Sequence, residues 1–114
     1  MYEDALDLFK QMPFKPDEVI LTILFKICSE LENKEALRLA TKMFNEMPKT
    51  FYRNSTLISS YLHMLMKFGK ISDAENIFAQ IKTKNTIHYG TMMQGNSSSN
   101  VIYIYSFSFL KNLF

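Results

Sequence analysis

Residues 36–48 read ALRLATKMFNEMP, and this stretch decides the fold. Ala40, Phe44 and Met47 lie at i, i+4 and i+7 on one helix face, and Pro48 ends the helix. The same pattern recurs twice elsewhere, as Ala5, Phe9 and Met12 and as Ala74, Phe78 and Ile81. The copies are spaced by 35 residues (Ala5 to Ala40) and 34 residues (Ala40 to Ala74). This period is typical of stacked helical repeats, so we predict an all-α fold, an α-solenoid.

The same pattern predicts helices over 2–12, 18–30, 34–47, 55–68 and 71–81, and another beginning near residue 86. Four residues can cap them, namely Asp17, Asn33, Asn54 and Asn85. Gly69 can end the fourth helix without steric penalty. Apolar residues surround most of the helix over 18–30, which predicts that it is packed on both sides.

The pattern ends after Gly95. Residues 96–100, NSSSN, predict a loop, and residues 101–114 alternate aromatic residues with others at a strand-like period. This stretch is too short for an ordinary membrane span. We therefore expect an irregular, divergent tail over 96–114, and no membrane partner.

Composition and charge limit the function classes. The 114 residues are 47% hydrophobic, enough for two to three helical repeats. Residues 1–47 carry a net charge of −3 and residues 48–114 one of +5. This asymmetry favours an anionic ligand on the second half, or reflects a solvated face. Six basic residues there are candidate phosphate contacts: Lys49, Arg53, Lys67, Lys70, Lys82 and Lys84.

Catalytic and metal chemistry find little support in the sequence. The single Cys28 excludes an internal disulfide and a multi-cysteine zinc site. His63 and His88 lack metal-ligand spacing with each other or with Cys28, and no glycine-rich phosphate loop is present. We expect a protein that is not an enzyme and that needs no cofactor and no metal. No targeting segment is apparent at the start, which suggests a fragment of a longer protein.

Three segments carry a family resemblance. They are EDALDLFKQM at 3–12 with KPD at 15–17, KFGKISDAENIF at 67–78, and YGTMMQG at 89–95. They look like pentatricopeptide repeats, and the resemblance covers about residues 1–95. It implies a right-handed superhelix of antiparallel helix-turn-helix units that binds single-stranded RNA in mitochondria or another organelle; without it, a cytoplasmic location is the default.

The capping residues divide the chain into units. We predict a partial repeat at 1–17, a long unit at 18–54, a short unit at 55–85, the start of a third unit at 86–95 and the tail at 96–114. This alternation of lengths resembles the mixed-length subclass of the family. Such proteins act in RNA processing, editing or stabilisation, so RNA-processing or editing proteins are further expected partners.

The resemblance also assigns RNA-binding residues. Thr22, Ser59 and Gly90 take the base-reading position, although glycine offers no side chain there. The closing partners are Asn54 for Thr22 and Asn85 for Ser59. Val19, Thr56 and Ile87 are the wedge residues that would lie against the faces of the bases. A hydroxyl and an amide can bond to a base edge, whereas an apolar wedge is indifferent to sequence.

Other interpretations remain open. The asparagines are natural helix caps, and Thr22 and Ser59 can be small residues where helices approach. The fold also suits a protein-interaction solenoid of the tetratricopeptide kind, although the chain has no Trp. A truncated product that is inactive alone is the third alternative, because two complete units are near the minimum for stability.

Overall fold

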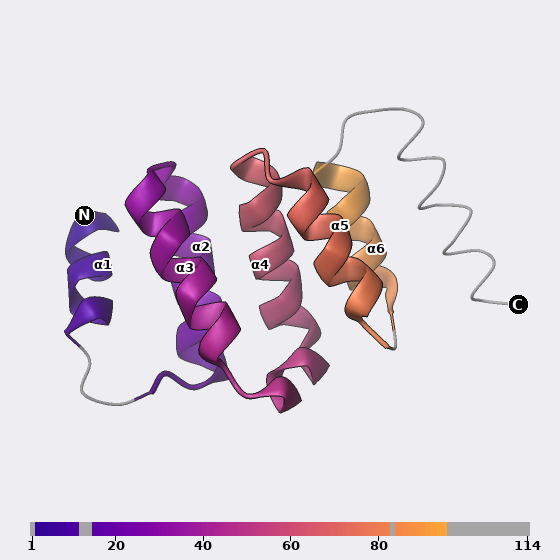
Figure 1. The fold of residues 1–114 in the computed structure, drawn as a ribbon, viewed down its shortest axis with the longest axis horizontal. Helices are drawn as coiled ribbons and strands as arrows, with labels where there is room; N and C mark the ends of the chain where they lie inside the picture. Colours follow the sequence, from indigo (N-terminus) through magenta and orange to yellow (C-terminus); the bar gives the residue numbers. More distant parts are fainter. Residues whose placement is uncertain (1, 12–14, 83, 96–114) are drawn as a thin grey trace, which may run out of the picture.

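A computed structural model describes residues 2–11, 15–82 and 84–95 (Figure 1). All regular elements within these ranges are helical, which confirms the predicted all-α fold. They are α1 (Tyr2–Lys10), α2 (Glu18–Leu31), α3 (Lys34–Glu46), the 3-10 helix η1 (Lys49–Arg53), α4 (Ser55–Lys67), α5 (Ile71–Gln80) and α6 (Thr86–Gly95). The tail predicted at 96–114 lies outside the described residues. None of the helices in the described ranges is long and apolar enough to cross a bilayer.

The helices stack in the order that a repeat array requires. Helix α4 packs between α2 and α6, so these three form one row (Figure 1). Helix α3 packs on α2, α5 packs on α4, and α1 packs on α2. The predicted units 18–54 and 55–85 thus each hold one helix pair, while their boundaries and the right-handed twist stay predictions.

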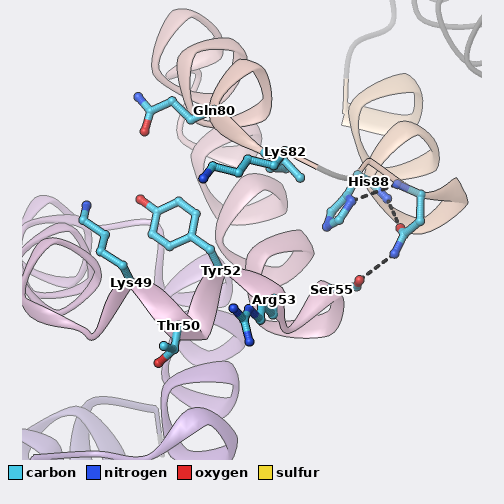
Figure 2. A pocket seen from close by; sticks show the side chains of 10 residues that line it. Lys49, Thr50, Tyr52, Arg53, Ser55, Gln80, Lys82 and His88 are labelled. Carbon is cyan, nitrogen blue, oxygen red and sulfur yellow. Dashed lines mark hydrogen bonds between the residues drawn. The ribbon is translucent and has the colours of Figure 1, made fainter.

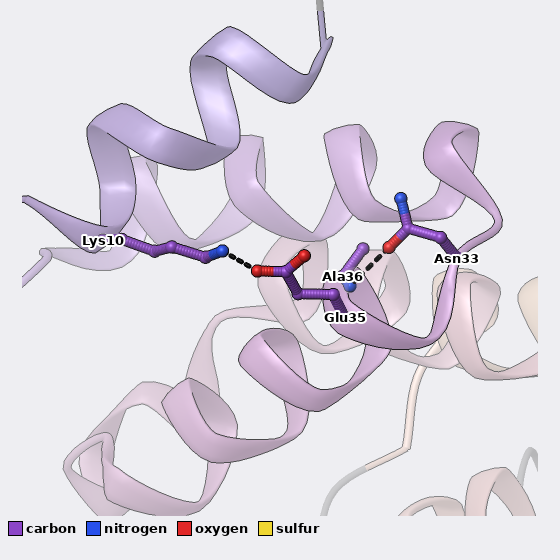
Figure 3. Close-up of polar contacts among 4 residues, drawn as sticks. All are labelled: Lys10, Asn33, Glu35 and Ala36. Atoms are coloured by element: carbon purple, nitrogen blue, oxygen red, sulfur yellow. Dashed lines mark hydrogen bonds and ion pairs between the residues drawn. The ribbon is translucent and has the colours of Figure 1, made fainter.

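Side chains cap the helices where the sequence predicts. Each capping oxygen accepts a hydrogen bond from the backbone N–H three residues later: Asp17 from Ile20 (2.9 Å), Asn33 from Ala36 (2.7 Å) and Asn54 from Leu57 (3.0 Å). Figure 3 shows the Asn33 cap. At the other ends, Gly69 has a φ of 76°, as expected for a glycine terminus, and Glu32 adopts a left-handed φ of 52°. The helix boundaries are therefore local consequences of the sequence.

The apolar ladder forms the core. Ala40, Phe44 and Met47 are buried, as are Ala74, Phe78 and Ile81, so the predicted packing role is confirmed for these two copies. In the first copy Phe9 is partly buried, and Met12 and the side chain of Ala5 lie outside the described part. An aromatic cluster joins α2, α3, η1 and α4, and consists of Phe25, Phe44, Tyr52 and Tyr61.

The three helices of the row differ in burial. Helix α4 lies between two neighbours and has nine buried residues. Helix α2 is contacted by α1, α3 and α4, in keeping with its apolar circumference. One face of α2 nevertheless stays open, because Val19 is 66% exposed and Ile23 is 47% exposed. An apolar face on the open side of the row is a feature to be explained by function.

Two ion pairs join helices that are distant in sequence. Lys10 of α1 pairs with Glu35 of α3 (Figure 3), and Lys67 of α4 lies 3.5 Å from Glu30 of α2. Their side chains are partly exposed, and such pairs contribute about 0–1 kcal/mol each. They help to align the helices, while apolar burial supplies most of the stability.

Candidate nucleic-acid interface

The predicted wedge residues form an exposed row. Val19, Thr56 and Ile87 are each the second residue of their helix, on α2, α4 and α6. Val19 is 66% exposed, Ile87 is 49% exposed, and Thr56 is also exposed. Because α4 packs directly against both neighbours, these side chains lie on successive helices of one row. The row presents apolar atoms to solvent at the same position of the outer two helices.

One residue of this face was missed by sequence reasoning. Ile23 lies one helical turn after Val19 and is 47% exposed, although the apolar pattern assigned it to the core. Comparison of the units at equal offset would have found it, since the matching residues are Ser60 and Thr91, which are polar. Ile23 therefore extends the apolar surface of α2 by one turn.

The predicted base-reading residues lie deeper than the wedges. Thr22 is half-buried, and its hydroxyl donates to the backbone oxygen of Glu18 at 2.8 Å. Ser59 is 8% exposed, and its Oγ has no hydrogen-bond partner among the described residues. Gly90 is half-buried. The Ser59 hydroxyl is an available donor and acceptor, because an unpaired buried hydroxyl costs about 1–3 kcal/mol.

Asn85 links two neighbouring units. Its Oδ1 accepts from the backbone N–H groups of Ile87 (3.0 Å) and His88 (3.2 Å), so it caps α6. Its Nδ2 donates to Ser55 Oγ at 2.5 Å (Figure 2). Ser55 lies one helical turn before Ser59 on α4, so this bond holds the closing residue Asn85 within one turn of Ser59. Asn54, the closing partner predicted for Thr22, caps α4 instead through Leu57.

His88 lies beside this cap and is 2% exposed. Its Nδ1 accepts from the backbone N–H of Asn85 at 3.1 Å. Burial, and secondarily the charge of Lys84, lower the pKa of His88 below its ordinary value of 6.5. The ring is therefore neutral at pH 7 and carries its hydrogen on Nε2. That N–H has no partner within the described ranges.

Cofactor and metal chemistry gain nothing from the geometry. The described residues contain no group of three or more His, Cys, Asp or Glu side chains that could hold a metal ion. Cys28 is buried, and desolvation raises the pKa of its thiol to about 12, so it holds no reactive thiolate at neutral pH. The polar groups that remain suit hydrogen bonding to a ligand.

Comparison with known proteins finds pentatricopeptide repeat-containing proteins of Arabidopsis thaliana. One is 30% identical over 112 residues, covering 89% of this chain and 14% of the relative. Two others, both named as mitochondrial, are 31% identical over 110 residues (89% of this chain, 16% of the relative) and 28% identical over 98 residues (80% and 14%). No family profile and no solved structure matches the chain.

These similarities extend over most of the chain but over little of each relative. The chain spans 13% to 19% of the length of the curated relatives that it matches. Eight such relatives, all named as pentatricopeptide repeat proteins, agree with the helical stacking. The resemblance predicted from the motifs is therefore confirmed.

Proposed function

We propose that this chain, whose similarity to pentatricopeptide repeat proteins covers most of its length, is a single-stranded RNA-binding module of a longer array. The observation that carries the proposal is the exposure of Val19 and Ile87 at the position that Thr56 occupies between them. Apolar side chains exposed at equal positions on successive helices suit contact with the faces of unstacked bases. Relatives named as mitochondrial support an organelle as the site of action.

In this proposal one base lies between Val19 and Thr56 and the next between Thr56 and Ile87. Thr22 and Asn54 read the first base, and Ser59 and Asn85 read the second. The second pair is the better defined, since the bond from Asn85 to Ser55 holds the amide near the unpartnered Ser59 hydroxyl. The module acts without catalysis of its own, and RNA-processing or editing proteins would act on the RNA that it positions.

Fluorescence anisotropy with short labelled single-stranded RNAs that differ in one base tests the proposal. The double variant Ser59→Ala with Asn85→Ala should lose base preference. Removing each hydrogen bond should weaken binding of the preferred RNA by about 2- to 12-fold, the equivalent of about 0.5–1.5 kcal/mol.

A matched control separates recognition from stability. Ser29 is also a buried serine, and Asn33 also caps a helix, yet neither belongs to the proposed site. Ser29→Ala with Asn33→Ala should leave base preference intact. Unchanged affinity and preference in the Ser59 and Asn85 variant would refute the assigned roles. A partner captured after nuclease treatment and retained in high salt would instead favour a protein-interaction solenoid.

A further inference from the structure

A pocket opens beside Asn85, where the connections between helices meet (Figure 2). Its volume is about 790 Å³, within the range of about 300–1,000 Å³ that is typical of ligand sites. Helix η1 contributes Lys49, Tyr52 and Arg53, and the segment after α5 contributes Lys82. Asn85 and His88 line it as well. The pocket thus joins the long unit's connector to the start of α6.

The lining is positively charged. Lys49, Arg53 and Lys82 are exposed, and no carboxylate is found among the described residues that line the pocket. Where the structure describes the chain, none of the three forms an ion pair. Cations gathered at a concave surface without acidic partners raise the local positive potential and attract anions.

The structure separates these three from the other basic residues of the second half. Lys67 is paired with Glu30, and Lys84 donates to the backbone oxygen of Ile81 at 3.0 Å. Lys70 lines a different groove, between α3 and α5, which also contains Asp73. Of six candidate phosphate contacts in the sequence, half therefore converge on one pocket.

Neutral groups complete a surface suited to a sugar-phosphate chain. Lys49 Nζ lies 5.3 Å from the ring centroid of Tyr52, so this aromatic wall keeps a cation at its face. His88 carries an N–H without a partner among the described residues, and it lies on the same lining. Phosphate oxygens accept hydrogen bonds from such donors as well as from lysine and arginine.

We propose that this pocket binds a backbone phosphate of single-stranded RNA, next to the base that Ser59 and Asn85 read. The inference rests on the proposed function. It gives η1 a role that base recognition alone does not supply, since the extra residues of the long unit contribute two of the three cations.

The salt dependence of RNA affinity tests this inference in the complete chain. The pocket variant is Lys49→Ala with Arg53→Ala and Lys82→Ala. The matched control is Lys34→Ala with Arg38→Ala and Lys42→Ala, which removes the same residue types and the same charge from exposed positions of α3. Thermal melting of both variants checks folding, and Lys49→Arg with Lys82→Arg keeps the charge.

For the pocket variant, the slope of log affinity against log salt concentration should become shallower by about 0.7 for each phosphate that the protein no longer neutralises. The control variant and the charge-preserving variant should keep the wild-type slope. A neutral methylphosphonate placed at each linkage in turn should weaken wild-type binding several-fold at one position, and should cost the pocket variant nothing there. Base preference should survive in every case.

Equal slopes for the pocket and control variants would overturn the inference while leaving base recognition intact. Competition by inorganic phosphate at constant ionic strength that removes the difference between wild type and pocket variant would assign the pocket to a free anion instead. Absence of RNA binding by the wild type would overturn the proposed function itself, so the two failures are distinguishable.

Discussion

The rings of Phe44 and Tyr61 stack with their centroids 3.8 Å apart and their planes inclined by 5°. Phe44 belongs to α3, in the long unit, and Tyr61 belongs to α4, in the next unit. Tyr52 of η1 and Phe25 of α2 pack against the same pair, with centroids 5.4 Å from Phe44 and 4.9 Å from Tyr61. The joint between the two units is therefore aromatic, and its disruption should reach both units.

Phe44→Ala should lower the free energy of unfolding by about 3–5 kcal/mol, because a buried ring is removed and a cavity remains. The change is measurable by urea denaturation followed by circular dichroism. Tyr61→Phe is the control, since it keeps the stacked ring and removes only the hydroxyl that bonds to Thr41. This control should cost about 0.5–1.5 kcal/mol. Equal losses in both variants would mean that the stack does not hold the units together.

Asn54→Ala and Asn33→Ala should each destabilise the chain by about 1 kcal/mol, because each removes an equivalent N-cap bond. Only Asn54→Ala should also change RNA affinity. Asn54→Asp is more informative, since aspartate caps a helix as well as asparagine does but has no N–H to offer a base. It should keep wild-type stability and alter base preference in anisotropy measurements. If Asn33→Ala alters preference as much, Asn54 acts only as a cap.

Cys28 should be inert in the folded chain. It is buried, and burial raises the pKa of its thiol to about 12, so the thiolate needed for alkylation is scarce at neutral pH. Mass spectrometry after iodoacetamide treatment should find the thiol unmodified in buffer and modified in urea. The half-modified point should match the unfolding midpoint. Rapid labelling under native conditions would show that α2 opens locally.

His88 should make stability depend on pH. Its pKa is lowered in the folded chain, chiefly by burial, so below its ordinary pKa of 6.5 the unfolded state binds a proton that the folded state refuses. This contribution is intact above pH 6.5 and is lost progressively as the pH falls toward the lowered pKa. Urea denaturation between about pH 7.5 and pH 5.5 should show the decline.

His88→Asn should flatten that decline, because asparagine can accept the hydrogen bond of the Asn85 N–H without titrating. The carboxylates titrate alike in both proteins, so the difference between the two profiles isolates the histidine. Parallel profiles for wild type and variant would contradict the assignment.

The helices and their caps could be predicted from sequence because both depend on local chemistry. Apolar spacing defines a helix face, and an Asp or Asn before it satisfies the first backbone N–H groups, as at Asn33 and Asn54. Helix η1 was predicted only as a linker, because the sequence KTFYR over 49–53 has no periodicity.

The candidate site could be predicted only in part, because exposure depends on neighbouring helices. Thr22 and Ser59 have the same offset, yet Ser59 is the more deeply buried, since α4 has a neighbour in the row on each side. Likewise, Lys67 and Lys82 look equivalent in sequence. Only the fold places Glu30 beside one of them and a pocket beside the other.

Helix η1 holds the additional residues of the long unit at the edge of the stack, and it has no fully buried residue. Helices α2 and α4 pack directly against each other despite this insertion, as α4 and α6 do without one. Unit length is thereby decoupled from the register of the array. Insertions and deletions can accumulate in this connector during evolution, or be engineered there, while the wedge row keeps its order.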